Sequence, residues 1–138
     1  MLILGTMDSA TRAKVFIAED SKAIRDRLVE MLGAVHGVAV VGDAETPDDA
    51  IAGILQTKPN YVVLDYQLDG GTAIDVLHGL HASLPDTVFV VLTNHANPQY
   101  RRICLAAGAS YFFDKSLEFD KVRDVVAAAT PVGADGPE

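Results

Sequence analysis

The sequence predicts an α/β fold, a doubly wound, five-stranded parallel sheet with helices on both faces. Five short apolar runs rich in β-branched residues lack the polar alternation of half-exposed strands, which is typical of strands buried in a parallel sheet. Segments with the periodicity of amphipathic helices lie between these runs. The order is therefore βαβαβαβαβα, and right-handed crossovers between parallel strands place helices on both faces.

The first half of the chain supplies two strand and helix pairs. The run Val15 to Ala18 predicts the first strand, and the next helix has its apolar residues on one face: Ile24, Leu28, Met31, Leu32 and Val35. A second strand is expected near Val38 to Val41. Thr46 and Pro47 supply an N-cap and a first-turn proline for a second helix, which we expect to end near Lys58.

The second half repeats the unit three times. Its strands are expected at three apolar runs: Tyr61 to Leu64, Val88 to Leu92 and Tyr111 to Asp114. Each run precedes a helix signal. Thr72 and Asp75 form a capping box for a helix that extends to about Ser83. Asn97-Pro98 begins a helix that Gly108 ends. Ser116 is the expected cap of the last helix, whose apolar stripe consists of Val122, Val125, Val126 and Ala129.

The composition indicates one domain with a single core. The chain has 138 residues, 49% of them hydrophobic, and we expect a loose leader at residues 1–12, a folded domain at 13–130 and a flexible tail at 131–138. The formal net charge of −8 is unfavourable for direct binding to nucleic acid or to an anionic membrane surface. No apolar stretch is long enough to span a bilayer, and a single cysteine, Cys104, cannot form an internal disulfide, so we expect a cytoplasmic protein.

Polar residues stand where four of the expected strands end. Glu19 and Asp20 follow the first strand, Asp65 follows the third, Thr93 closes the fourth and Lys115 follows the fifth. Ligands of open α/β sheets bind outside the carboxyl ends of the strands, so these side chains are expected to share one pocket. Such a set suggests phosphate and divalent-metal chemistry, with Asp65 as a nucleophile that forms an acyl phosphate and with Asp20 and Asp65 as ligands of Mg²⁺.

These residues, in this order and spacing, resemble the receiver domain of bacterial two-component response regulators, whose architecture is (βα)5 and flavodoxin-like. The similarity runs from about Lys14 to Thr130 and includes Gly108-Ala109 ahead of Lys115. The resemblance implies a phosphorelay protein in which Asp65 accepts a phosphoryl group from a histidine kinase or phosphotransfer protein, with Mg²⁺ or Mn²⁺ bound. It implies a signalling receiver that catalyses only its own phosphorylation and dephosphorylation.

The resemblance also assigns roles to the residues around Asp65. Glu19 would contact the metal through water, and the main-chain carbonyl of Gln67 would complete the protein ligands. Thr93 and Lys115 would sense the phosphoryl group from two sides.

A switch aromatic and a readout surface follow from the same resemblance. Phe112, or Tyr111 beside it, would rotate into space that Thr93 vacates. The changed surface would be the fourth helix, the fifth strand and the fifth helix, including Tyr100, Arg101, Arg102 and Tyr111. The segments Leu92-Thr93-Asn94 and Tyr111 to Ser116 resemble a subgroup often found without an output domain, so a stand-alone receiver with an unknown output protein is expected.

Departures from the family pattern keep other interpretations open. They are Glu19 in place of Asp, Asp69 in place of Pro, Ala73 in place of Gly, Asn94 in place of Ala or Gly, and Ser116 in place of Pro. One alternative is a receiver-fold interaction domain without phosphoryl chemistry. Another is a metal-dependent phosphohydrolase with an Asp nucleophile, although this chain has Gln67 where such enzymes usually carry a second Asp. A flavin site is disfavoured because acids stand where the phosphate would need backbone donors.

Each candidate also has a purely structural interpretation. Asp65 could cap a turn, Glu19 or Asp20 could be the N-cap of the next helix, Thr93 could be an ordinary strand residue and Phe112 an ordinary core residue. The histidines have no partnered cysteines, so no zinc site is expected.

Overall fold

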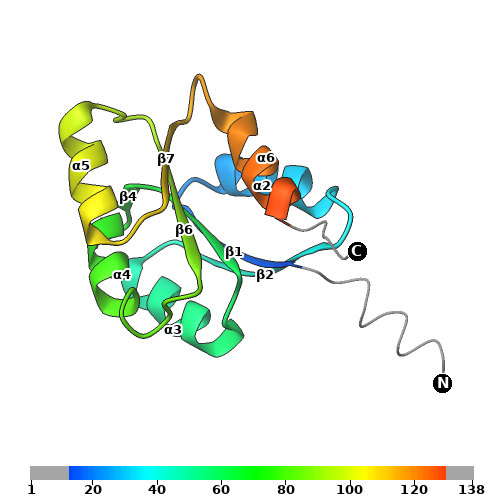
Figure 1. The fold of residues 1–138 in the computed structure, drawn as a ribbon, viewed down its shortest axis with the longest axis horizontal. Helices are drawn as coiled ribbons and strands as arrows, with labels where there is room; N and C mark the ends of the chain where they lie inside the picture. The colour runs from blue at the N-terminus through cyan, green and yellow to red at the C-terminus, as the bar shows by residue number, and fades with distance from the viewer. Residues whose placement is uncertain (1–12, 130–138) are drawn as a thin grey trace.

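A five-stranded parallel sheet forms the centre of the structure, a computed structural model that describes residues 13–129 (Figure 1). Its strands are β1 (Ala13–Ala18), β2 (Val38–Ala44), β3 (Tyr61–Leu64), β6 (Val88–Thr93) and β7 (Tyr111–Asp114). The strand order is β2-β1-β3-β6-β7, so the chain first winds from β1 to one side and then, from β3 onward, to the other. The doubly wound parallel sheet expected from the sequence is confirmed.

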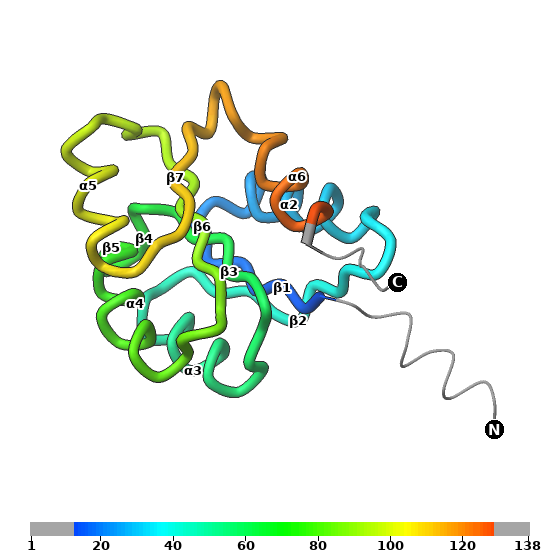
Figure 2. Tube along the Cα trace, viewed as in Figure 1, coloured from blue at the N-terminus to red at the C-terminus, as the bar shows by residue number. Residues whose placement is uncertain are grey.

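Helices cover both faces of this sheet. They are α2 (Lys22–Gly33), α3 (Pro47–Thr57), α4 (Ala73–Leu80), α5 (Pro98–Ala107) and α6 (Phe119–Ala129). Figures 1 and 2 show α2 and α6 on one face and α3, α4 and α5 on the other. Because strand residues alternate between the faces, Val15 and Ile17 of β1 join the core beneath α2 and α6, whereas Phe16 and Ala18 join the core beneath the other three helices.

Three of the predicted helix caps are present. The side chains of Thr46, Thr72 and Asn97 accept hydrogen bonds from backbone N–H groups in the first turns of α3, α4 and α5. Thr72 and Asp75 form the predicted capping box. Gly108 ends α5 with a φ of 123°, a backbone conformation that favours glycine.

A short antiparallel hairpin between Asp65 and α4 was not expected from the sequence. It pairs β4 (Gln67–Leu68) with β5 (Gly71–Thr72), and Gly70 in its turn has a φ of 88°. The N–H of Asp69 donates to the carbonyl of Glu45, at 3.0 Å. This bond ties the loop after β3 to the loop after β2.

The predicted start of the last helix is wrong. α6 begins at Phe119, and Ser116 does not cap it because the Asp114 carboxylate accepts the N–H groups of Ser116 and Leu117. The N–H of Asp114 in turn donates to the carboxylate of Glu118. Lys115 is therefore held within a turn organised by Asp114.

Two other elements end at residues different from those expected. α4 ends at Leu80, short of Ser83, and β2 continues to Ala44, past Val41.

Phe16 fills a space that two glycines leave open between β2 and α3. The β1–β2 register shifts between Val15 and Phe16. A Cβ atom on Gly42 would lie 2.9 Å from the Phe16 Cε2 atom, and one on Gly53 would lie 2.6 Å from it. Neither glycine can therefore carry a side chain while this buried ring keeps its place.

The expected leader at residues 1–12 and tail at 131–138 lie outside the described residues, as does Thr130. Within residues 13–129, no helix is both long and apolar enough to cross a membrane. Cys104 is buried in the core, as expected, and burial raises the pKa of its thiol to about 11.

Candidate functional site

The register of the sheet brings the predicted site residues to one edge. Ala18 of β1, Leu64 of β3 and Val91 of β6 lie side by side, so the residues that follow them leave the sheet at the same level. The backbone at this edge is fixed by two hydrogen bonds: the N–H of Asp65 donates to Ala18, and the N–H of Glu19 donates to Ala44. Because these anchors are main-chain bonds, the positions of the two acids follow from strand pairing.

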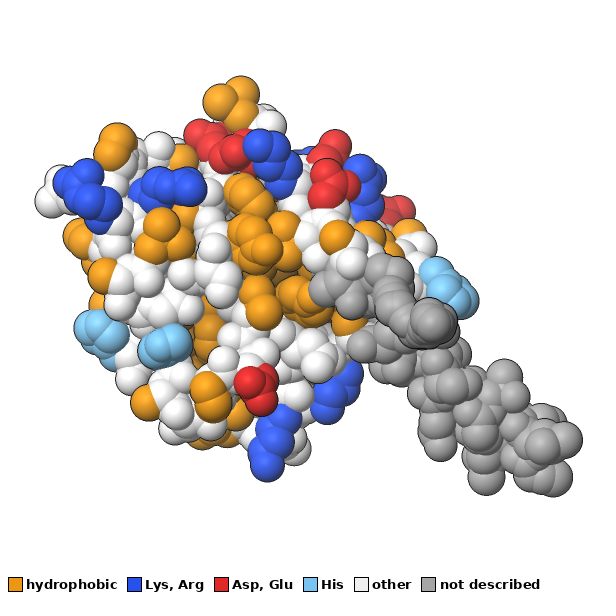
Figure 3. All heavy atoms as spheres, in the orientation of Figure 1, with side chains coloured by type: hydrophobic (Ala, Val, Ile, Leu, Met, Phe, Trp, Pro, Cys, Tyr) orange, Lys and Arg blue, Asp and Glu red, His pale blue; other side chains and the backbone are white. Residues whose placement is uncertain are grey.

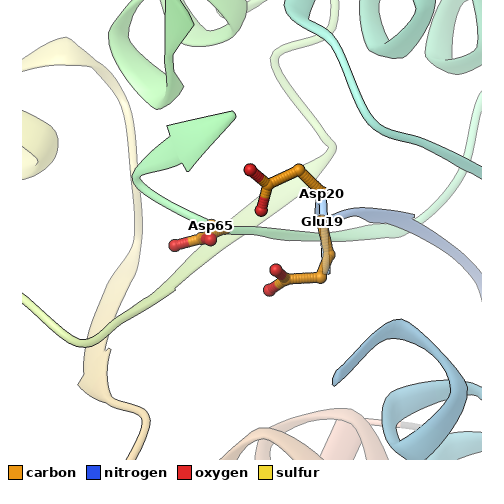
Figure 4. A group of neighbouring side chains, drawn as sticks. All are labelled: Glu19, Asp20 and Asp65. Carbon is orange, nitrogen blue, oxygen red and sulfur yellow. The ribbon is translucent and has the colours of Figure 1, made fainter. Parts of the chain in front are cut away.

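Three carboxylates gather at this edge. Glu19, Asp20 and Asp65 each offer one carboxylate oxygen, and these oxygens all lie within 4.8 Å of one another. Figure 4 shows Glu19 and Asp20 extending to opposite sides of the end of β1, with Asp65 beside them. Glu19 and Asp65 are buried, whereas Asp20 is exposed.

Glu19 has both carboxylate oxygens engaged. Oε1 lies 2.8 Å from the Lys115 Nζ atom, and Oε2 accepts the N–H of Ser21 at 3.0 Å. The residue is only 2% exposed. Burial raises the pKa of Glu19 above its ordinary value and the charge of Asp65 adds to the rise, while the hydrogen bonds from Lys115 and Ser21 oppose it.

Lys115 joins the two buried acids. Its Nζ atom donates to Asp65 Oδ2 at 3.0 Å as well as contacting Glu19. Burial by itself lowers the pKa of Lys115, but its hydrogen bonds and ion pairs with Glu19 and Asp65 outweigh this, so that pKa lies above its ordinary value. The pair of acids and the single ammonium leave a net negative charge, to which exposed Asp20 adds.

The donor set fits a small hard cation. Mg²⁺ takes oxygen ligands at about 2.1 Å, so ligands on opposite sides of the ion lie about 4.2 Å apart. The oxygens of Asp20 and Asp65 lie within 4.8 Å of each other, a separation that one such ion can bridge. Since Glu19 has no free oxygen, its contact with an ion fits a bridging water better than direct ligation. Gln67, at the start of β4, lies two residues beyond Asp65 with its side chain exposed.

Thr93 lies next to Lys115 at the end of β6. It is fully buried at the end of β6, where its Oγ1 accepts the N–H of His95 at 3.1 Å and its carbonyl accepts the N–H of Lys115 at 2.9 Å. The adjacent aromatic residues differ, because Phe112 is 3% exposed and Tyr111 is 40% exposed. Phe112 lies in the core beneath α5, and its carbonyl accepts a hydrogen bond from Arg101.

Two contributors to the site were missed in the sequence. Ser21, rather than Glu19 or Asp20, is the N-cap of α2, a role that its hydroxyl and its place directly before the helix could have indicated. Arg25, on α2, donates through Nη1 to the Glu19 carbonyl at 2.8 Å. No local pattern marked Arg25, because its partners come from other loops.

Comparison with known proteins identifies relatives over most of the chain. Residues 15–127 match the family described as the response regulator receiver domain. The DNA-binding transcriptional activator DevR/DosR of Mycobacterium tuberculosis is 31% identical over 121 residues, which cover 88% of this chain and 54% of that protein. The response regulator GacA of Pseudomonas aeruginosa is 26% identical over 113 residues, or 82% of this chain and 53% of that protein. The chain thus spans about half the length of these curated relatives.

Solved structures agree with this match. The signal receiver domain of NarL from Mycobacterium tuberculosis superposes with a TM-score of 0.79 at 22% identity, covering 87% of this chain and 97% of that chain. The isolated receiver domain of RcsB from Salmonella enterica, determined with the phosphomimetic BeF3−, gives a TM-score of 0.77 at 21% identity and covers 86% and 88%. At these identities the structural matches establish the fold.

Proposed function

Because this chain belongs to the family of response regulator receiver domains of two-component systems, we propose that it receives a phosphoryl group on Asp65. The donor would be a histidine kinase or a phosphotransfer protein. The observation that carries the proposal is the contact of 3.0 Å between the Asp65 carboxylate and the buried Lys115 ammonium, with Glu19 and Asp20 alongside. A carboxylate that served only as a turn cap would need no buried cation.

The proposed chemistry is direct phosphoryl transfer. An oxygen of Asp65 attacks phosphorus, the bond from phosphorus to the donor nitrogen breaks, and an acyl phosphate forms on Asp65. Lys115 already holds Asp65 Oδ2, so it orients the carboxylate and lies ready to pair with a phosphoryl oxygen. The chain's own carboxylate is the acceptor, and the donor nitrogen leaves with the electron pair of the broken bond.

Asp20 and Asp65 are proposed to hold Mg²⁺ or Mn²⁺ directly, with the main-chain carbonyl of Gln67 as a third ligand and Glu19 acting through water. When bound, the cation shields the negative charges that attack would otherwise bring together. The exposure of Asp20 and the two occupied oxygens of Glu19 support this division of roles.

Thr93 and Lys115 are proposed to read the phosphoryl group. The Thr93 hydroxyl accepts one hydrogen bond, from His95, and keeps its own proton to donate to a phosphoryl oxygen. Movement of that hydroxyl toward Asp65 would carry the segment after β6 with it. Phe112, which already lies in the core, would adjust to the space left behind, with Tyr111 as the exposed neighbour.

The output surface is proposed to consist of α5, β7 and α6. Figure 3 shows basic side chains over α5 next to exposed hydrophobic ones, and the exposed residues here include Arg101, Arg102, Ile103, Tyr111 and Leu117. A surface with both kinds of side chain suits a protein partner, because apolar contacts supply affinity and charges supply selectivity.

A receiver-fold interaction domain without phosphoryl chemistry is the second candidate. The observation that favours it is Lys115, which is shared between Asp65 and Glu19 and is therefore partly neutralised before any phosphoryl group arrives. A phosphohydrolase is less well supported, because Gln67 carries no acidic proton for a leaving group.

Labelling with a small phosphodonor separates these candidates. The protein is incubated with acetyl phosphate and Mg²⁺, and hydroxylamine-labile phosphate is mapped by peptide mass. We expect label on Asp65, none on the Asp65→Asn variant, and normal label on Asp69→Asn, a control for an exposed carboxylate four residues away. Undiminished labelling of Asp65→Asn, or no labelling of the parent protein, would remove the proposal.

A further inference from the structure

Arg25 connects the loop after β1, which carries Glu19 and Asp20, to the end of β2 and the loop that follows it. From α2 it donates through Nη1 to the Glu19 carbonyl at 2.8 Å, and its Nη2 lies 3.1 Å from Glu45 Oε2. Its Nε atom lies 3.9 Å from Asp43 Oδ1. The Arg25 side chain is 12% exposed, whereas those of Asp43 and Glu45 are about half exposed at 52% and 53%.

The contacts continue from Glu45 to the segment after β3, which carries Asp65. The carbonyl of Glu45 accepts the N–H of Asp69, in the hairpin that follows Asp65. One continuous set of bonds therefore runs from the Glu19 carbonyl through Arg25 and Glu45 to the chain beyond Asp65. It lies apart from Lys115, which joins Glu19 to Asp65 by their side chains.

Asp20 depends on this set of bonds more than its neighbours do. Its carboxylate accepts no hydrogen bond from the residues that the structure describes, so only its backbone fixes its direction. The peptide group between Glu19 and Asp20 contains the carbonyl that Arg25 holds. A planar peptide transmits that constraint directly to the Asp20 Cα atom.

We propose that Arg25 is a positioning residue for metal binding, which with Glu45 sets the spacing between the Asp20 and Asp65 carboxylates. The proposal rests on the proposed metal site at these residues. The guanidinium fork can hold a carbonyl and a carboxylate at once, which an ammonium group cannot do in the same geometry.

The sign of the effect distinguishes positioning from simple electrostatics. Arg25 is a cation near the site, so its removal should by charge alone favour binding of Mg²⁺. Loss of positioning should instead weaken binding. Partners that orient a ligand without touching the metal typically change metal affinity 10- to 100-fold, and we expect the low end here because the contact is to backbone.

The test is a Mn²⁺ titration of the folded protein, followed by paramagnetic broadening of amide signals, and a parallel Mg²⁺ titration. Arg25→Met should weaken binding about 10-fold. Arg25→Lys should restore part of the loss. Lys22→Met, which removes the same charge from an exposed position on the same helix, should leave the affinity unchanged or slightly tighter. The initial labelling rate of Arg25→Met should fall at limiting Mg²⁺ and recover at saturating Mg²⁺.

Other outcomes have definite meanings. If Arg25→Met binds as tightly as Lys22→Met while the parent is labelled on Asp65, the positioning role is wrong and the proposed function stands. If the parent itself binds no cation, the proposed metal site fails. Should Arg25→Met not fold, Glu45→Ala is compared with Asp48→Ala, which removes an equal charge nearby; equal affinities of that pair would overturn the proposal, and weaker binding by Glu45→Ala alone would support it.

Discussion

The cluster of carboxylates at the edge of the sheet has a closed side and an open side, which the adjacent residues Glu19 and Asp20 mark. The closed side consists of Glu19, Lys115 and Asp65, whose side chains are at most 9% exposed and are joined by ion pairs. The open side is Asp20, which is exposed and has no hydrogen-bond partner among the described residues. The buried charges are thus matched within the protein, whereas the exposed carboxylate of Asp20 is accessible to a ligand.

The largest expected effect is on stability, from breaking the closed side. Lys115→Met leaves Glu19 and Asp65 buried without their shared cation, and loss of one partner of a buried ion pair costs about 3 kcal/mol. Urea denaturation at neutral pH measures this loss. Lys121→Met removes an exposed lysine, paired with Glu118, and should change stability by less than about 0.5 kcal/mol. Equal losses of stability in the two variants would mean that the ion pairs of Lys115 stabilise the protein no more than an exposed ion pair does.

The open side is tested by metal linkage. At a concentration of Mg²⁺ about 100 times its dissociation constant, bound metal should raise the free energy of unfolding of the parent by about 2.7 kcal/mol. Asp20→Ala should lose this response, whereas Glu19→Ala should retain part of it because its contact with the metal is expected through water. The response is measured by thermal unfolding with and without Mg²⁺. A full response in Asp20→Ala would contradict the assignment of Asp20 as a direct metal ligand.

Thr93 should separate formation of the acyl phosphate from its readout. Thr93→Ala should still be labelled on Asp65, since the closed and open sides are intact. It should lose much of the coupling to α5, which in switches of this kind is about 1 to 3 kcal/mol, or about 5- to 150-fold in partner affinity. Amide shifts of Tyr100 to Arg102 and of Phe112 with a beryllofluoride mimic report the coupling. A response equal to that of the parent would leave Thr93 as a strand residue and move the switch to Lys115 or the β4–β5 hairpin.

The smallest expected effect is the pH dependence of the closed side. The pKa of Lys115 lies above its ordinary value of 10.5, so its stabilising contribution is fully present below about that pH and is lost as pH rises through the folded-state pKa. The difference in stability between the parent and Lys115→Met should therefore narrow above that pH. Burial also raises the pKa values of Tyr61 and Tyr66, but both proteins share these groups. Urea titrations at increasing alkaline pH measure this difference. If the stability difference between the parent and Lys115→Met stayed constant, the stabilising role of the Lys115 charge would be contradicted.

The convergence of the site could be predicted because it depends on strand ends alone. In a parallel sheet, residues that follow adjacent strands emerge at one edge, so Asp65, Glu19 and Lys115 were placed together by counting from apolar runs. The structure brings them into contact. Their roles in phosphoryl transfer stay predictions.

What could not be predicted depends on contacts between distant segments. Whether Glu19 is buried depends on Lys115, which follows another strand. Ser116 failed as a cap because Asp114 and Glu118 already satisfy the backbone of that turn. The β4–β5 hairpin is only two residues deep on each side, too short to leave a periodic pattern. Arg25 has the sequence surroundings of any exposed arginine, and its partners Glu19 and Glu45 directly follow β1 and β2.

The ring of Phe16, lying against Gly42 and Gly53, links three positions that are far apart along the chain. A side chain at either glycine would collide with the ring, so neither glycine can be replaced while the Phe16 ring keeps its size and place. Among related sequences, substitutions at these three positions should consequently be correlated, with larger residues at 42 or 53 accompanied by a smaller one at 16. The order of such replacements would also be constrained, because the ring must shrink before a glycine can grow.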